Sequence, residues 1–591
     1  MKKITLISVL MMFFVLSVEA DELDGRDIYL YGRLHSGQAV KASRNIGPAS
    51  GADAACVNCH RPSGMGSVEG NILMPPITGN ALGLNDSGAS SVTATMDLRS
   101  RKSFNPLHPP YTQKQLADAI RKGIKSDGTA MADLMPRYAL SDLEVSALIK
   151  YLGGLSETNS EGATDTAIHL ATVITPDVSE EKKRIFLNLL NKKITVKNSS
   201  TVVGQTSGRR HAITAAEFYY GTERKWNHQI WELHGDPSTW EDQLNAYYQK
   251  KPVFALLSGL GSQTWQPVSD FCEKKQVPCW FPSVDIPGRM THQNYSLYFN
   301  QGVRLEAGLL LDYLAQQDPV KTKKVVQIYK NDFIGNASAQ SLVAISLSTH
   351  QAIANVALDE INEASLTKAF SGLEEGDVLM LWLGTEDLVL LNHLTPPKNA
   401  VYISGRLGAF ASEQLNPTWK RAVRMIYPYE LPARRQLSLD HFHQWMQTFQ
   451  MPVVDEPLQA EVYFAVEYLG DTLTDMLNNM YRDYLLERAE SQLSINQVSK
   501  SEQRALLRKS IKPIGREVLP DLDKNNNQVD PKFSGLPKGI GSGSTTIYPR
   551  MSLGNGERFA SKGGYVVRFK DENSNVLEDL SGWIVPGNLD N

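Results

Sequence analysis

The sequence is poor in cysteine, in net charge of either sign and in long apolar runs. Four cysteines in 591 residues are too few to staple a chain of this length, which excludes a disulfide-rich scaffold. Lys and Arg number 60 against 64 Asp and Glu, so the basic excess of a nucleic-acid binder is absent and no nucleic-acid partner is expected. With 42% hydrophobic and 21% charged residues, the composition is that of a globular protein with several domains.

The one long apolar run lies at the N-terminus. Residues 4–18 are apolar and follow Lys2 and Lys3, and Val18-Glu19-Ala20 at the end of the run offers small residues at the cleavage-site positions. A basic start, an apolar stretch and small residues at the end are typical of a secretory signal peptide. The run is also shorter than the roughly 18 residues that a membrane span requires. We expect cleavage after residue 20 and a periplasmic mature chain without a membrane span.

A cofactor motif follows the N-terminal segment. Cys56-Val57-Asn58-Cys59-His60 is a C-x-x-C-H sequence, in which two thiols can form thioethers with the vinyl groups of one haem and the histidine can ligate the iron. A zinc site would need a second ligand pair, and a redox dithiol would need a βαβ frame, whereas the flanking segments are Gly- and Pro-rich. The motif predicts one covalent haem c, with His60 as the proximal ligand.

Two methionines compete for the sixth position on the iron. Met131 and Met135 lie in a loop between two predicted helices, which begin after Thr112 and after Ser141. The second helix has a capping box and carries Leu and Tyr along one face. The residues alone leave both methionines open as ligands.

The loop and the final helix resemble class I cytochromes c. In that family the distal ligand belongs to a Met-Pro pair before the last helix, as Met135-Pro136 does here. The resemblance covers about residues 22–155 and implies a small all-α domain with Met135 as the distal ligand and Met131 as the alternative. An iron with both axial positions filled cannot easily bind substrate, so the domain is expected to pass single electrons.

Beyond a polar segment at 156–166, which we interpret as a linker, apolar runs alternate with helical patterns. This alternation predicts βαβ units and parallel sheets. No phosphate-binding glycine motif follows the strands, so nucleotide binding has no support. The predicted strands are 168–174, 229–233, 253–258, 325–329, 377–383 and 400–404, with helices at 238–250 and 304–316.

This larger part resembles the type I periplasmic binding proteins of the leucine/isoleucine/valine-binding family. The resemblance rests on His234-Gly235-Asp236-Pro237, on Gly261-Ser262-Gln263-Thr264, and on Tyr329-Lys330-Asn331-Asp332-Phe333-Ile334-Gly335. It is good over 167–450 and weaker to residue 591. It implies two α/β lobes hinged around a cleft that encloses a small ligand.

The cleft residues implied by the resemblance depart from an amino-acid clamp. Ser262 aligns with the serine that holds the ligand carboxylate, with Thr264 beside it, and a strand-to-helix turn there suits an anion. Asp285 stands where the family has a threonine and would repel a carboxylate, and Arg406 falls near the second-lobe acid. Tyr329 is a further candidate for the lining. The ligand is therefore different from an amino acid, or the cleft is vestigial.

The two remaining cysteines, Cys272 and Cys279, lie close together in the sequence. In an oxidising compartment they predict a local disulfide.

The fold prediction is multidomain, with a small all-α cytochrome c domain followed by a two-lobed α/β domain like the periplasmic binding proteins. The expected parts are a signal peptide at 1–20, the cytochrome domain at 21–155, the linker at 156–166 and the binding-protein-like domain at 167–591, including a Gly-rich extension at about 515–591.

The predicted function is that of an exported mono-haem cytochrome, an electron carrier rather than a catalyst by itself. It would have a redox partner protein and either a small molecule or a protein bound by the α/β domain. The alternative is the electron-accepting subunit of a periplasmic dehydrogenase complex, in which the α/β domain is a docking surface.

Overall fold

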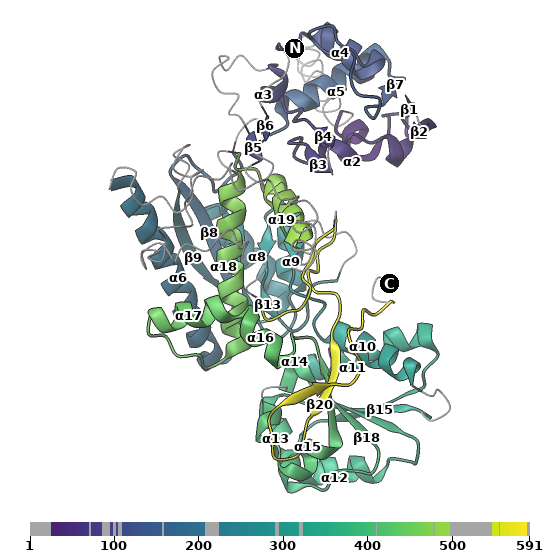
Figure 1. Ribbon diagram of the computed structural model, residues 1–591, viewed down its shortest axis with the longest axis vertical. Helices are drawn as coiled ribbons and strands as arrows, with labels where there is room; N and C mark the ends of the chain where they lie inside the picture. Colours follow the sequence, from purple (N-terminus) through teal and green to yellow (C-terminus); the bar gives the residue numbers. More distant parts are fainter. Residues whose placement is uncertain are drawn as a thin grey trace, which may run out of the picture. The chain divides into compact units, whose positions relative to one another are not determined.

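A computed structural model gives the fold of the chain (Figure 1). The predicted signal peptide at 1–20 and the first part of the Gly-rich extension, 515–545, lie outside the residues that the structure describes. The described residues are 25–45, 47–69, 72–84, 95–97, 102–104, 109–156, 159–206, 224–289, 295–317, 323–408, 411–476, 479–496, 546–554 and 556–587.

The chain forms two compact units, which are described separately. Unit 1 comprises Met1–Asp165, Ala212–Glu223 and Leu473–Arg488, and unit 2 comprises Thr166–His211, Arg224–Thr472 and Ala489–Asn591. A short piece of the C-terminal half, 473–488, therefore belongs to unit 1.

Unit 1 is built from short helices joined by loops and small antiparallel strand pairs. Residues 25–31 are helical, and β1 pairs with both β2 and β7. The helices are α2 (Val57–His60), α3 (Gly79–Leu82), α4 (Gln113–Lys122) and α5 (Asp142–Gly154), with a 3-10 turn at Gly51–Ala54. The strands are β1 (Lys41–Arg44), β2 (Gly47–Ser50), β3 (Ser67–Glu69), β4 (Ile72–Met74), β5 (Thr95–Asp97), β6 (Lys102–Phe104) and β7 (Arg137–Tyr138).

The longer helices of unit 1 begin at capping residues, and one of them is closely approached by the helix at 25–31. The hydroxyls of Thr112 and Ser141 cap α4 and α5 in complete capping boxes, which satisfy amide groups that would otherwise lack partners. Gly25 lies so near α5 that a Cβ there would be 2.2 Å from the carbonyl oxygen of Ala147. This close approach brings buried residues of both helices into one core that also includes Cys56.

The first sheet of unit 2 forms its first lobe. All its strands run parallel in the order β13-β11-β8-β10-β12-β14, and β9 pairs with the other edge of β8. The strands are β8 (Ala167–Ile174), β9 (Lys225–Glu232), β10 (Ala255–Leu257), β11 (Leu260–Gly261), β12 (Cys279–Trp280), β13 (Ser283–Val284) and β14 (Ser296–Leu297).

Helices cover this first sheet. The core joins Trp231, Trp265 and Phe271 to the strands, while Trp280 stacks on Tyr468 of α18 at 5.2 Å and donates to the carbonyl of Ala465 at 3.0 Å. Figure 1 shows α18 lying along this sheet. The helices are α6 (Glu180–Thr206), α8 (Trp240–Lys250), α9 (Gln266–Lys275), α16 (Pro432–Ser438), α17 (Asp440–Thr448), α18 (Glu456–Met476) and α19 (Arg482–Asn496).

The second sheet forms the second lobe. Its strand order is β16-β15-β17-β18-β19-β20-β21, parallel as far as β19 and antiparallel at the last two strands. The strands are β15 (Val325–Lys330), β16 (Ile353–Leu358), β17 (Val378–Trp382), β18 (Ala400–Ser404), β19 (Val423–Tyr427), β20 (Tyr565–Phe569) and β21 (Leu577–Asp579). The helices are α10 (Val303–Gln316), α11 (Phe333–Thr349), α12 (Glu363–Ser371), α13 (Thr385–Val389), α14 (Gly405–Gly408) and α15 (Pro417–Ala422).

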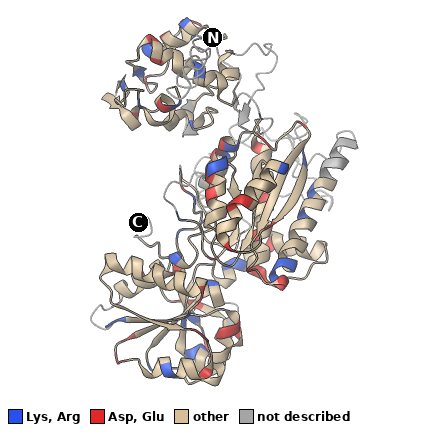
Figure 2. Cartoon of the chain, turned by 180° about the vertical axis from the view of Figure 1, so that it is seen from behind, with Lys and Arg blue, Asp and Glu red and all other residues tan. Residues whose placement is uncertain are grey.

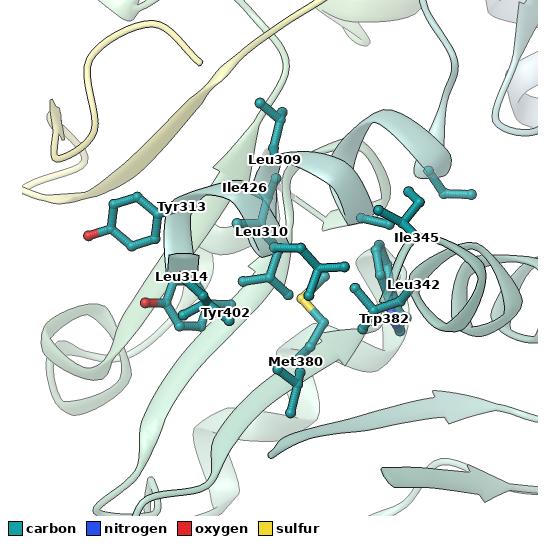
Figure 3. Packing of buried hydrophobic residues seen from close by; sticks show 14 of the residues in the cluster. Leu309, Leu310, Tyr313, Leu314, Leu342, Ile345, Met380, Trp382, Tyr402 and Ile426 are labelled. Carbon is teal, nitrogen blue, oxygen red and sulfur yellow. The ribbon is translucent and has the colours of Figure 1, made fainter. Parts of the chain in front are cut away.

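The second-lobe core lies between this sheet and helices α10 and α11. Leu310 and Leu314 of α10 and Leu342 of α11 meet Met380 and Trp382 of β17 (Figure 3). The strands are mostly uncharged, and the charged residues of both signs lie chiefly on helices and loops (Figure 2). Continuous apolar strands are expected of a parallel sheet covered on both faces.

The predicted alternation of strands and helices is confirmed in unit 2, where each predicted strand overlaps an observed one. The C-terminal strand at 565–569 adds to the second-lobe sheet beside β19, as the yellow strand in Figure 1 shows. This pairing needed the structure. In the part of the chain that the structure describes, no helix has the length and apolarity needed to cross a membrane.

Candidate functional site

The C-x-x-C-H motif lies on a single helical turn. Cys56 directly precedes α2, and Cys59 and His60 end it. The His60 amide donates to the carbonyl of Cys56 at 2.9 Å, which closes the turn and holds the two cysteines and the histidine together. Cys56 and His60 are buried, at 8% and 6% exposure, and Cys59 is half-buried.

The imidazole of His60 is oriented by the backbone. Its Nδ1 lies 3.0 Å from the carbonyl oxygen of Pro75, which can only accept, so Nδ1 carries the proton and Nε2 carries the lone pair. Burial lowers the pKa of His60, which favours the neutral ring. A neutral histidine that donates its outer N–H to a carbonyl is the usual form of a metal ligand.

Both candidate methionines pack on the same core as Cys56. Met131 and Met135 are half-buried neighbours of that cluster. Arg137 ties their backbone together, since its Nη1 donates to the carbonyl of Met135 and its Nη2 to that of Met131, at 3.4 Å. The contacts hold both methionines near the motif without choosing between them.

These residues fit a covalent haem. Two thiols one turn apart, a histidine whose Nε2 is available for ligation and two thioether side chains on one apolar core are the donor set that a c-type haem requires. A haem held by Cys56, Cys59 and His60 would supply one-electron chemistry.

A residue that the sequence does not suggest also contacts the loop after His60. Both carboxylate oxygens of Glu487 accept from Ser63, one from its amide at 2.7 Å and one from its hydroxyl at 2.6 Å. The partners are 424 positions apart in the chain, and Glu487 belongs to the 473–488 piece of unit 1. Burial raises the pKa of Glu487 to about 8.

In unit 2 the structure brings Ser262, Asp285 and Arg406 to carboxyl ends of strands. Ser262 follows β11 and Asp285 follows β13, which pair in parallel with Gly261 opposite Val284. In parallel sheets that edge is where ligands bind. Arg406 follows β18 of the second lobe and reaches Asp285, so its side chain joins the two lobes.

The guanidinium of Arg406 donates its hydrogen bonds to groups of the protein itself. Nε donates to Asp285 at 2.8 Å, Nη2 to the carbonyl of Val284 at 2.7 Å and Nη1 to the hydroxyl of Tyr548 at 2.9 Å. Glu461 lies 3.7 Å from Nη1. The Arg406 side chain is only 7% exposed, so it is buried with its charge compensated. We call Arg406, Asp285, Glu461 and Tyr548 the interlobe cluster.

Tyr548 comes from the described part of the Gly-rich C-terminal segment. Its ring stacks on Phe299 at 5.3 Å and lies 5.5 Å from the ring of Tyr429. Its hydroxyl donates to Glu461. Burial raises the pKa of the Tyr548 phenol well above its usual value, so the hydroxyl keeps the proton that it donates.

Two carboxyl groups beside Arg406 are also buried. Glu306 accepts from the hydroxyl of Ser404 and from the amide of Arg406, the latter at 2.7 Å, and burial raises its pKa to about 8. Burial likewise raises the pKa of Glu461. With a pKa of about 8, the Glu306 carboxyl is mostly protonated at neutral pH and adds little negative charge here.

The remaining predicted cleft residues have other partners. The amide of Ser262, in the turn expected to suit an anion, donates to the carboxylate of Asp177 at 2.8 Å. The hydroxyl of Thr264 accepts from the amide of Gln266 at 3.2 Å. Tyr329 is 7% exposed and lies in the second-lobe core.

Cys272 and Cys279 are both fully buried in the first-lobe core. The structure holds both as thiols, and their disulfide stays a prediction.

Comparison with known families places a cytochrome c domain in this chain. Residues 47–156 match the family model described as cytochrome c, which includes the C-x-x-C-H motif and both methionines. The family implies covalently bound haem c. No curated protein matches the chain.

Solved structures resemble the larger part of the chain. A fatty acid ABC transporter substrate-binding protein from Thermomonospora curvata covers 73% of this chain and 95% of its own, at 12% identity and a TM-score of 0.43. A possible leucine/isoleucine/valine-binding protein from Rhodopirellula baltica SH 1 covers 71% and 98%, at 11% identity and a TM-score of 0.45. A leucine binding protein from Thermotoga maritima MSB8 covers 71% and 99%, at 9% identity and a TM-score of 0.44.

The fold class is that of a multidomain chain, with a cytochrome c region followed by an α/β part that has two sheets, one parallel throughout and one parallel except at its last two strands. Sequence reasoning missed four residues that complete the two sites: Asp177, Glu461, Glu487 and Tyr548. Each meets its partner across a long stretch of chain, and no local pattern marks any of them.

Proposed function

We propose that the chain is an exported mono-haem cytochrome that transfers single electrons, and that its α/β unit recognises a solute or a partner protein. The observation that carries the electron-transfer part is the hydrogen bond from Nδ1 of His60 to the carbonyl of Pro75. It fixes the tautomer that ligates iron, directly after the two cysteines that would hold the haem.

The axial ligands proposed for the iron are His60 and Met135, with Met131 as the alternative. A His/Met pair raises the reduction potential relative to two histidines. With both positions filled, the chain's own residues exclude water and substrate from the metal, and what remains is electron exchange with a redox partner protein. The C-x-x-C-H motif and the N-terminal pattern of residues 1–20 support export to the periplasm.

For the α/β unit, the interlobe cluster supports recognition that does not use Arg406 or Asp285 as ligand contacts. Both are paired with each other, and Tyr548 lies against Arg406. A small ion would have to replace these contacts, at the cost of leaving a buried charge without its partner. This favours docking of a partner protein over capture of a charged solute.

The test is an anaerobic redox titration of the purified protein, followed by exposure of the reduced form to carbon monoxide. We expect a single one-electron step and no carbon monoxide adduct in the wild type. Met135→Ala should open the sixth position and bind carbon monoxide, and the matched variant Met131→Ala should not.

The opposite pattern, with only Met131→Ala binding the gas, would move the distal ligand to Met131. A wild-type protein that binds carbon monoxide readily would contradict the electron-carrier proposal, because its iron would have an open site.

A further inference from the structure

We infer that Glu487 is a positioning residue for the haem site, holding the loop after His60 from outside the cytochrome sequence. The inference rests on the proposed haem ligation by His60 and deepens it. Glu487 belongs to the piece 473–488, which lies more than 300 positions beyond the cytochrome sequence match and yet is part of unit 1.

The carboxylate of Glu487 binds Ser63 at two points. One oxygen accepts from the amide and the other from the hydroxyl of Ser63, and Ser63 is 1% exposed. The hydroxyl of Ser63 in turn accepts from the amide of Met65 at 3.1 Å, and the hydroxyl of Ser156 donates to the Ser63 carbonyl at 2.7 Å. Every polar group of Ser63 is thus bonded, and a buried, fully satisfied network of this kind is rigid.

The clamped loop is linked to the carbonyl that orients His60. The amide of Ile77 donates to the carbonyl of Gly64, the residue after Ser63, at 2.8 Å. Two residues before Ile77, Pro75 presents its carbonyl to Nδ1 of His60. Movement of Ser63 would therefore alter the hydrogen bond between the Pro75 carbonyl and Nδ1 of His60, which sets the basicity of the imidazole.

The piece that carries Glu487 is itself anchored in unit 1. The side chain of Asn159 accepts from the amide of Met480 at 3.1 Å, and the amide of Ser160 donates to the Met480 carbonyl at 2.9 Å. The hydroxyl of Ser160 accepts from the amide of Arg482, also at 3.1 Å. The segment 156–166 is thus hydrogen-bonded to the start of α19, which aims Glu487 at the loop.

Loss of the clamp has a predictable direction at the iron. A strong hydrogen bond from Nδ1 makes the imidazole more basic and stabilises the oxidised metal. Weakening that bond is therefore expected to raise the reduction potential.

The experiment compares midpoint potentials of full-length holoprotein at one fixed pH. Glu487→Gln keeps the shape of the side chain but leaves one acceptor oxygen where Glu487 has two, and its potential should rise. The matched control is Glu490→Gln, one turn further along α19, whose carboxylate pairs with Arg558 at 2.7 Å and has no described contact with the loop. Its potential should equal that of the wild type.

Ser63→Ala provides a second variant that removes only the hydroxyl donor, and it should raise the potential less than Glu487→Gln does. If Glu487→Gln yields no soluble holoprotein, Ser63→Ala decides. A wild-type potential in the deciding variant, or an equal shift in Glu490→Gln, would overturn the inference. A wild-type chain without covalent haem would overturn the proposed function itself, which distinguishes the two failures.

Discussion

The haem motif and the interlobe cluster both place polar side chains in the protein interior, but the two arrangements serve different purposes. At the haem motif, the backbone holds together on one turn the two thiols and the imidazole that a covalent haem would require. At the interlobe cluster, Arg406 and Asp285 neutralise each other, which leaves little for a charged ligand. The first arrangement suits a cofactor, and the second suits the stability of the fold.

The two sites also differ in how they are assembled along the chain. The haem ligands on the proximal side lie within five residues, whereas the interlobe cluster joins residues from four distant segments. The spacing of a local motif is set by neighbouring residues alone. A cluster from distant segments depends on the whole fold and, in return, stabilises it. The predictions below test this contrast.

The largest effect is expected for His60→Ala. Removal of the proximal ligand should abolish the low-spin haem spectrum, because no other described side chain is aligned by the Pro75 carbonyl. Absorption spectra of the oxidised and reduced protein measure this. His35→Ala is the control, since His35 is exposed in the same unit and its loss should leave the spectrum unchanged. A normal low-spin spectrum in His60→Ala would contradict the assignment of His60 as the proximal ligand.

The next effect is expected for Arg406→Ala. It leaves the half-buried Asp285 and the buried Glu461 without their cation, and breaking a buried pair costs about 3–5 kcal/mol. Unfolding followed by tryptophan fluorescence reports on unit 2, because all nine tryptophans lie in it.

The control for Arg406→Ala is Arg421→Ala, whose pair with Glu572 is exposed, with 73% of the arginine side chain accessible. Exposed pairs contribute about 0–1 kcal/mol. Equal losses in the two variants would mean that the interlobe cluster is not a stabilising element.

A smaller loss is expected for Tyr548→Phe. The ring and its stacking stay, but the hydroxyl that donates to Glu461 and accepts from Arg406 is removed, which should cost about 1–3 kcal/mol. In the double variant with Arg406→Ala the two losses should not add, because they remove parts of one network. Simple additivity would show that Tyr548 acts independently of Arg406.

The smallest effect is expected for a change of one pH unit, through the pH dependence of the free energy of unfolding. Burial raises the pKa of Glu306 from 4.5 to about 8, so between these values the folded state binds a proton that the unfolded state has released. The stability of unit 2 should therefore be greatest below pH 4.5 as far as this group is concerned, and fall by up to ~1.4 kcal/mol per pH unit up to about pH 8.

Glu306→Gln should flatten this slope, because the amide does not titrate and can still accept from the Arg406 amide. Unfolding curves of both proteins across this pH window provide the measurement. An identical slope in the variant would assign the dependence to another group.

The features that could be predicted from the sequence are those that depend on neighbouring residues. The capping residues Thr112 and Ser141 set the starts of α4 and α5, and the apolar runs set the strands of both lobes. The C-x-x-C-H motif is readable because its chemistry depends on spacing alone. The haem site is therefore largely accessible from the sequence.

The parts that were not predicted are contacts across distant segments. Glu487 lies in a helical stretch without a distinguishing pattern, and no nearby residue indicates that it contacts Ser63. Tyr548 follows a Gly-rich stretch in which an aromatic residue has no evident partner. Arg406 was expected near a ligand, but its pairing with Asp285 requires knowledge of how the two strand ends meet.

The difference between the haem motif and the interlobe cluster is tested most directly by native mass spectrometry of the protein purified from a periplasmic fraction. The account predicts the mass of the chain cleaved after residue 20 plus one covalent haem, with no second bound molecule, because the interlobe cluster satisfies its own charges. A mass without haem would contradict the account of unit 1. A retained small molecule that is lost in Arg406→Ala would contradict the account of the interlobe cluster.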